Sequence, residues 1–150
     1  MSGTRVRAAR GADVPALRTL VAGAFAPFTA RTGARSAPPV DWETVVWALA
    51  AVVATRDDRV VGVLVLWPHP DHVLVEILAV APEEQGRGVG AALLDRAELT
   101  AIESGTNTVR LQTDARMTEA LAHWVRRGYT EVGRRPLNGV DRVLLEKRLG

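Results

Sequence analysis

A glycine-rich loop is the feature of this chain whose residue types and spacing point most directly to chemistry. It reads Gln85-Gly86-Arg87-Gly88-Val89-Gly90-Ala91 and stands between an apolar run that ends at Val80 and a segment with helical spacing. Glycine lets a ligand approach the backbone closely, and the first amides of a helix have no acceptor within that helix. The positive end of the helix dipole adds to the attraction for an anion. The loop therefore predicts a site for a phosphate-bearing ligand.

The pattern around this loop resembles the motif of a known family. Val80-x-Pro82-x-x-Gln85-Gly86-x-Gly88-x-Gly90 is similar to the acyl-CoA-binding motif of the GNAT superfamily of N-acetyltransferases. The segment Met117 to Tyr129 resembles the next helix and strand of that fold, and residues 5–20 resemble its first strand and helix. The resemblance implies acetyl-CoA as co-substrate, and transfer of its acetyl group to a primary amine by direct attack in a ternary complex.

The resemblance also implies how the coenzyme is held. The amides of Gln85 to Ala91 would hold the CoA pyrophosphate, and the opened strand edge at Leu78, Ala79 and Val80 would receive the pantetheine arm as if it were a strand. Leu78 and Val80 are the expected backbone partners of that arm. Arg87 would add positive charge near the phosphates, and a solvated loop arginine is the alternative. The expected coenzyme-binding residues are Leu78, Ala79, Val80, Gln85, Gly86, Arg87, Gly88, Val89, Gly90 and Ala91.

An isolated carboxylate precedes the loop. Glu76 is the only acid in the apolar run Val73–Val80, and by strand alternation it shares a sheet face with Leu78 and Val80. Deprotonating an amine with a pKa of about 10.4 at pH 7 costs about 4.6 kcal/mol, so the reaction needs a base. The family often places a carboxylate on this strand to hold a water, and Glu76 is the candidate base. A salt bridge to an arginine is the alternative.

The general acid is where the chain departs from the family. Family members often carry a tyrosine on the helix before the Gly-aromatic pair, and Trp124 stands there in this chain. An indole N–H is no useful acid, His123 should point to another side of the helix, and Tyr129 is expected in the core. Asp114 stands where the family frequently has asparagine. Solvent water is therefore the expected acid.

The acceptor amine, a small molecule or a peptide, has the weakest sequence signal. The resemblance implies that the segment between the first two helices borders the acceptor groove, where Phe25, Phe28 and Arg31 would shape it or else pack between helices. His69 and His72 flank a proline-rich turn, where solvated histidines are more common than a metal site. No metal is expected.

Two other interpretations of the loop stay open: a dinucleotide site, and a glycine-rich turn that binds nothing. Gly86-x-Gly88-x-x-Ala91 also matches a dinucleotide fingerprint, but five residues separate the apolar strand from the first glycine, and only one strand–helix–strand crossover follows. For the chain as a whole, the missing tyrosine motivates an alternative function, that of a catalytically silent acyl-CoA-binding or regulatory domain.

Composition limits the class of protein. The chain has 150 residues, 47% hydrophobic and 24% charged, which predicts a single domain over residues 1–150. The net charge of +2 is spread along the chain, so no nucleic-acid surface is expected. There is no apolar run of membrane length and no secretion signal, so neither membrane association nor export is expected. With no cysteine, the composition fits a cytoplasmic protein. Homodimerisation is left open.

Periodicity and turn residues predict an α/β (α+β) fold. The sequence predicts a mixed, mostly antiparallel twisted sheet of about six to seven strands with helices on both faces, which is the order of the GNAT-like acyl-CoA N-acyltransferase fold. Asp13 is the expected N-cap of the first helix. The expected strands are 6–9, 51–55, 60–67, 73–80, 109–113, 129–134 and 142–147; the expected helices begin near 14 and span 41–49, 88–103 and 118–127, with a loop over 32–39 and a hairpin turn at 138–139.

Overall fold

The structure, a computed structural model, describes residues 3–32, 40–137 and 139–150. Its elements are β1 (Arg5–Ala8), η1 (Gly11–Asp13), α1 (Val14–Thr32), α2 (Trp42–Trp47), β2 (Ala51–Arg56), β3 (Arg59–Pro68), β4 (Val73–Val80), η2 (Pro82–Glu84), α3 (Val89–Glu103), β5 (Thr108–Asp114), α4 (Thr118–Arg126), β6 (Thr130–Leu137) and β7 (Val140–Arg148). The predicted order of helices and strands is confirmed. Apart from Thr32, which ends α1, the expected loop over 32–39 lies outside the described residues, as does Asn138.

The strands form a seven-stranded sheet with the order β1-β2-β3-β4-β5-β7-β6. β4 and β5 pair in parallel, whereas β1 with β2, β2 with β3, β5 with β7 and β6 with β7 pair antiparallel. The predicted mixed, mostly antiparallel sheet is therefore confirmed. Within the described part of the chain, no helix combines the length and hydropathy that crossing a membrane requires.

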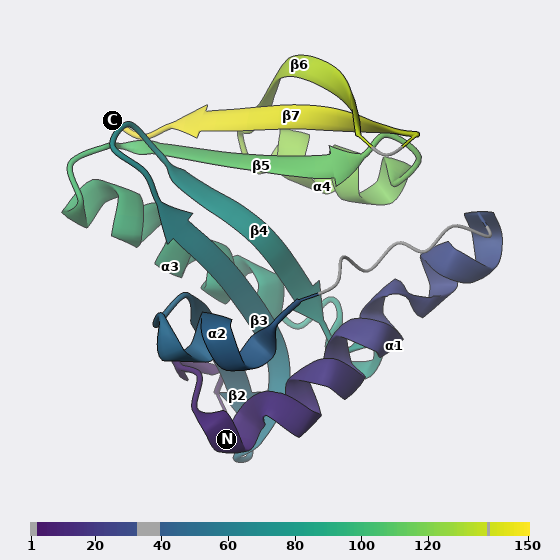
Figure 1. The fold of residues 1–150 in the computed structure, drawn as a ribbon, viewed down its shortest axis with the longest axis vertical. Coiled ribbons are helices and arrows are strands. Elements are labelled where there is room, and N and C mark those ends of the chain that lie inside the picture. Colours follow the sequence, from purple (N-terminus) through teal and green to yellow (C-terminus); the bar gives the residue numbers. More distant parts are fainter. Residues whose placement is uncertain (1–2, 33–39, 138) are drawn as a thin grey trace. The chain divides into compact units, whose positions relative to one another are not determined.

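The chain divides into two compact units. The first comprises residues 1–66 and 77–96, and the second comprises residues 67–76 and 97–150. In the first unit, β2 and most of β3 are buried on both faces, so helices must cover both sides of this part of the sheet. Figure 1 shows α1 and α2 on the near side of β2 and β3, and the start of α3 behind them. The β2–β3 turn places Asp57 and Asp58 at φ 52° and 60°, as a two-residue type I′ hairpin requires.

The start of the first long helix differs from the expectation. The Asp13 carboxylate accepts a hydrogen bond from the Arg10 amide at 2.8 Å and forms an ion pair with Arg7 at 2.8 Å. It therefore belongs to the short 3-10 turn η1 and is not the N-cap of α1. The helix then runs through Pro27 to Thr32, because a proline removes only one amide donor and the following residues continue the helical path.

The second unit contains the first half of β4, together with β5, β7 and β6. Val75, Leu111 and Leu145 stand side by side across β4, β5 and β7, and all three are buried. Alternation therefore places Leu74, Arg110 and Glu146 on the opposite face, where Arg110 donates to Glu146 at 2.8 Å. One face of this part of the sheet is thus apolar core, and the other carries the charged side chains.

Candidate functional site

The glycine loop connects β4 to α3 within the first unit. Gly86 and Gly88 have φ values of 81° and 83°, in the left-handed region that glycine adopts without strain. A Cβ added at either position would meet no protein atom within 4 Å. These glycines are therefore required by backbone conformation, not by packing, and the space beside them is open to a ligand.

The amides of this loop are available as donors. In the described residues, the amides of Gly86 to Ala91 have no acceptor in hydrogen-bonding geometry, and the Gln85 amide has only a long contact of 3.4 Å to the Pro82 carbonyl. The first well-formed bond of α3 runs from the Ala92 amide to the Gly88 carbonyl at 3.0 Å. A row of unsatisfied amides at the positive end of a helix fits an anion such as a diphosphate.

A buried carboxylate anchors the start of the loop. Glu84 is 5% exposed and forms ion pairs with Arg56 at 3.4 Å, Arg59 at 3.8 Å and Arg87 at 3.9 Å. Arg56 and Arg59 flank the β2–β3 turn, so Glu84 ties the loop to that hairpin. The Arg87 side chain is 59% exposed, and its distance to Glu84 exceeds that of a hydrogen bond.

Gly62 on β3 positions the helix that follows the loop. A Cβ at this position would lie 2.8 Å from Cγ1 of Val89 and 3.0 Å from Cδ1 of Leu93. The first turn of α3 therefore rests directly on the backbone of β3. Our sequence interpretation missed this residue, although a glycine inside an apolar strand is itself a sign of close approach.

The strand that leads into the loop has the expected alternation. Leu78 and Val80 are half-buried, whereas Ala79 between them is buried. The Val80 carbonyl accepts a weak hydrogen bond from Nε2 of Gln85 at 3.4 Å. The expected coenzyme-contact residues on β4 and in the loop thus all lie in one continuous stretch of the first unit.

Glu76 lies in the second unit and is exposed. Its Oε2 accepts a hydrogen bond from the indole Nε1 of Trp67, which lies on β3. In the part of the chain that the structure describes, no ion pair between Glu76 and an arginine or lysine is found. An indole donor orients a carboxylate without neutralising it, and the second oxygen, Oε1, stays available for a proton or a water.

The side chains near the expected acid position are packed in the core. Trp124 is 8% exposed, and its ring packs edge-on against Tyr129 with centroids 5.6 Å apart. Tyr129 is 1% exposed, and its hydroxyl donates to Glu98 at 3.1 Å. Burial, with the Glu98 charge, raises the pKa of Tyr129 above its ordinary value. The expectation that Tyr129 lies in the core is confirmed, and neither ring is placed as an acid.

Asp114 at the end of β5 is committed to structure. Its carboxylate accepts two hydrogen bonds from the Arg116 guanidinium, at 3.1 Å and 2.8 Å, and one from the Arg116 amide at 2.9 Å. These hydrogen bonds, with the charges of Arg116 and Arg142, hold the pKa of Asp114 below its usual value. His123 is exposed on α4 and stacks edge-on against Trp124.

The two turn histidines and the predicted acceptor residues have local partners. The rings of His69 and His72 stack 4.5 Å apart, and His72 contacts Asp71 at 2.7 Å. In the described residues, no group of three or more potential metal-ligating side chains is found.

The predicted acceptor residues Phe25, Phe28 and Arg31 lie on α1 instead of in an interhelical loop. Phe28 is buried, and the Arg31 guanidinium lies 5.7 Å from the centroid of its ring.

Comparisons with known proteins agree with the observed fold. A family profile described as Acetyltransferase (GNAT) family matches residues 19–129. Among solved structures, the chain is similar to the ribosomal-protein-S18-alanine N-acetyltransferase of Escherichia coli, with 19% identity, a TM-score of 0.73, and coverage of 98% of this chain and 94% of that one. No curated protein sequence matches the chain.

Two further similar structures contain a coenzyme. One is the PaiA N-acetyltransferase of Thermoplasma acidophilum in complex with coenzyme A, with 15% identity, a TM-score of 0.76, and coverage of 97% of this chain and 99% of that one. The other is YncA of Salmonella typhimurium with acetyl-CoA, with 18% identity, a TM-score of 0.73, and coverage of 99% and 95%. At such identities the likeness establishes the fold.

Proposed function

This chain belongs to the acetyltransferase (GNAT) family, and on that premise we propose that it transfers an acetyl group from acetyl-CoA to a primary amine. The observation that carries the proposal is the row of open amides from Gly86 to Ala91 beside two left-handed glycines. Structures of similar fold with coenzyme A or acetyl-CoA bound support acyl-CoA as the ligand class. The loop amides would hold the diphosphate, and Arg87 would add charge near it.

In this proposal the backbone of β4 receives the pantetheine arm. Leu78 and Val80 would hydrogen-bond the arm through their main-chain groups, so their side chains can vary among apolar types. The weak bond from Gln85 to the Val80 carbonyl is long enough to be replaced when a better donor arrives. Phe25, Phe28 and Arg31 on α1 would line the acceptor side.

Glu76 is the proposed general base. The amine nitrogen attacks the thioester carbonyl, the carbon–sulfur bond breaks, and the amine proton passes to Glu76 directly or through a water. Removing that proton from an amine with a pKa of about 10.4 costs about 4.6 kcal/mol at pH 7, and the base must offset this cost. The Trp67 indole holds one carboxylate oxygen and leaves the other for this proton.

Solvent water is the proposed acid. A thiol with a pKa of about 8.5 lies only about 1.5 units above neutral pH, so protonating the leaving thiolate contributes about 2 kcal/mol at most. Direct attack in a ternary complex is the proposed route, and the chain has no cysteine that could carry an acyl intermediate.

One observation favours a second candidate function. Trp124 and Tyr129 are both buried, so no phenol is placed to act as an acid. A catalytically silent acyl-CoA-binding domain would share the open loop amides and would need no acid.

Release of free thiol from acetyl-CoA across a panel of primary amines separates these candidates. Amine-dependent release above the hydrolysis background supports the transferase. CoA binding by calorimetry without amine-dependent release favours the silent domain. Binding of NAD in place of CoA would contradict both and support a dinucleotide site.

A further inference from the structure

A row of charged side chains crosses three strands in the second unit. Asp114 on β5 stands directly opposite Arg142 on β7, and Arg142 stands directly opposite Arg135 on β6. Directly opposed residues of antiparallel strands project from the same sheet face, with Cβ atoms about 5 Å apart. The row therefore brings two guanidinium groups and one carboxylate together at this end of β7.

The charges in this row do not balance. Asp114 is occupied by Arg116, which takes both of its oxygens. Arg142 contributes to the Asp114 environment only through its charge. The Nε of Arg142 is buried and has no hydrogen-bond partner in the described residues. Two arginines directly opposite one another are unfavourable, and a buried donor without an acceptor is costly. An anion on Arg142 and Arg135 would remove both penalties.

The row lies on the same sheet face as Glu76. Leu74, Arg110 and Glu146 are in register across β4, β5 and β7, and alternation adds Glu76 two residues after Leu74 and Arg142 four residues before Glu146. The β4–β5 pairing ends at Val75 with Leu111, so Glu76 directly follows the last paired residue of β4. In a paired sheet, residues two strands and two positions apart have Cα atoms about 12 Å apart, so the Cα atoms of Glu76 and Arg142 are separated by about that distance or more.

We propose that Arg142, with Arg135 beside it, binds a carboxylate carried by the amine acceptor. The inference rests on the proposed function, because it assumes that Glu76 marks where the amine reacts. The side chains of Glu76 and Arg142 are long enough that their charged groups can lie closer together than their Cα atoms. The acceptor class is therefore an amine whose carboxylate is separated from the nitrogen by several bonds. A guanidinium holds a carboxylate through two parallel hydrogen bonds, which gives direction as well as charge.

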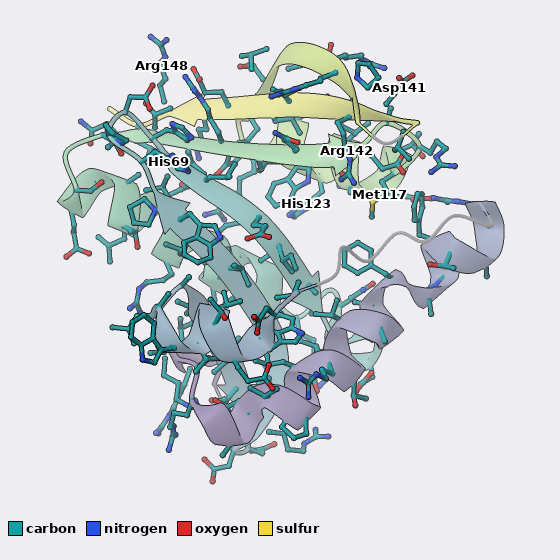
Figure 2. The ribbon with its side chains drawn as sticks, viewed as in Figure 1. His69, Met117, His123, Asp141, Arg142 and Arg148 are labelled. Atoms are coloured by element: carbon teal, nitrogen blue, oxygen red, sulfur yellow. The ribbon has the colours of Figure 1, made fainter. Side chains whose placement is uncertain are left out.

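The same strand offers a matched control. Arg148 also lies on β7 and shares the alternation of Arg142, but its side chain is 85% exposed and its Nε donates to Glu146 at 3.1 Å. Figure 2 shows Arg142 and Arg148 at opposite ends of β7, with Asp141 labelled at the Arg142 end. Asp141 is the neighbour of Arg142 in sequence, so it projects to the other face and does not complete the row.

A binding experiment tests the subsite without any turnover. Arginine Nε–H signals of the full chain are recorded by NMR while N-acetylglycine or its primary amide is added as the probe. The Arg142 signal, assigned by its loss in Arg142→Met, is expected to shift with the acid and not with the amide. Equal shifts with both probes, or a shift only at Arg148, would overturn the subsite.

A kinetic experiment tests the acceptor class. The substrates are ω-amino acids from glycine to 6-aminohexanoate, each paired with its amide. The wild type is expected to prefer the acid by about 10- to 100-fold in kcat/KM at the longer chain lengths, the range expected for a charged hydrogen-bonded contact. Arg142→Met should remove that preference, Arg142→Lys should keep part of it, and Arg148→Met should leave it unchanged.

The two experiments separate the failure of this inference from the failure of the proposed function. A wild type that releases thiol with the acids and amides equally refutes the subsite and keeps the transferase. A carboxylate-dependent shift of Arg142 without any amine-dependent thiol release keeps an anion site and refutes the transferase. A folded Arg142→Met variant, checked by its melting temperature, that retains the acid preference refutes the assignment to Arg142.

Discussion

The glycine loop and the β5–α4 region, here residues 108–129, differ in which of their polar groups are free to bind a ligand. In the loop, the functional groups are backbone amides from Gly86 to Ala91, and no packing contact limits the two left-handed glycines. In the β5–α4 region, side chains that could have done chemistry are held in the core: Tyr129 bonds Glu98, Trp124 packs on Tyr129, and Asp114 binds Arg116. The first region is open to a ligand and the second is closed by its own contacts.

This contrast explains why the loss of a family tyrosine does not remove the proposed function. In the proposed function, holding the coenzyme and taking a proton from the amine are the demanding tasks, and the first is assigned mainly to backbone amides. Protonating a thiolate contributes about 2 kcal/mol at most, which solvent supplies. The buried Trp124 in place of the family's tyrosine is therefore compatible with the proposed function. A side chain at position 88 is not, because it would stand where the coenzyme approaches the backbone.

Gly88→Val is expected to prevent CoA from binding to the glycine loop. Valine at a φ of 83° is strained, and its branched side chain would stand where the ligand approaches. Losing two charge-assisted amide contacts at about 1.5–3 kcal/mol each should lower CoA affinity by roughly two to four orders of magnitude, measured by calorimetry. The protein should stay folded, since the added Cβ meets no protein atom within 4 Å.

Gly105→Val is the matched control for that loss. Gly105 has a φ of 79° and equally open surroundings, but it lies after the other end of α3. It should lower the melting temperature about as much as Gly88→Val and leave CoA affinity unchanged. Unchanged affinity in Gly88→Val would refute the placement of the diphosphate.

Glu76→Gln tests the proposed role of Glu76 as general base. It keeps the shape of the side chain and removes the base, so kcat should fall by about 100-fold or more while CoA affinity stays constant. Steady-state rates at several amine concentrations check this result. A kcat within about threefold of wild type would refute the base assignment, because general-base catalysis contributes more than that.

Trp67→Phe is the companion variant for Glu76. It removes the indole donor and keeps a ring. If Trp67 acts by orienting Glu76, the Trp67→Phe substitution should lower kcat when Glu76 is present. It should have no further effect on kcat in the Glu76→Gln variant. Additive losses in the double variant would show that Trp67 acts elsewhere.

Tyr129→Phe would test whether the closed region is structural only. It removes the bond to Glu98 and should lower the free energy of unfolding by about 1 kcal/mol. The expected kcat is within about twofold of wild type, since the pKa of the buried phenol is raised and its proton is held by Glu98. A tenfold or larger loss of kcat in a folded variant would make Tyr129 the acid.

The pH dependence of stability gives the smallest expected effect. The pKa of Asp114 is lowered below its ordinary 3.8, chiefly by hydrogen bonds from Arg116. A depressed carboxyl stabilises the fold above about pH 4 and loses that contribution as the pH falls through its folded-state value. Asp114→Asn should therefore cost about 1 kcal/mol or less at pH 7, because Arg116 is half-exposed, and less still at pH 3. A pH-independent difference in melting temperature would contradict this account.

Backbone requirements made the fold and the loop predictable from sequence. The geometry of this region depends on local sequence: Gly86 and Gly88 indicate a left-handed loop, and the alternating run to Val80 indicates a strand. The strand, the loop and the helix were therefore correctly placed. Side-chain partners were harder to predict. The Trp67–Glu76 bond and the Arg142–Arg135 pairing join residues on different strands, and their register is not written in either strand alone.

Two local misplacements have the same cause. The carboxylate of Asp13 could serve either helix start, and its ion pair with Arg7 decides in favour of η1. Phe25, Phe28 and Arg31 were expected in the segment between the first two helices, but α1 continues to Thr32 and includes them. In both cases the sequence offers two local solutions, and contacts made by neighbouring residues select one.

Amide NMR during a CoA titration tests the central claim most directly. The ¹⁵N–¹H signals of Gly86 to Ala91 should shift downfield on addition of CoA, because amides without an acceptor gain a phosphate oxygen. Adenosine, which lacks the diphosphate, should leave them in place. Unmoved loop signals, with CoA-dependent shifts confined to other parts of the chain, would contradict the account.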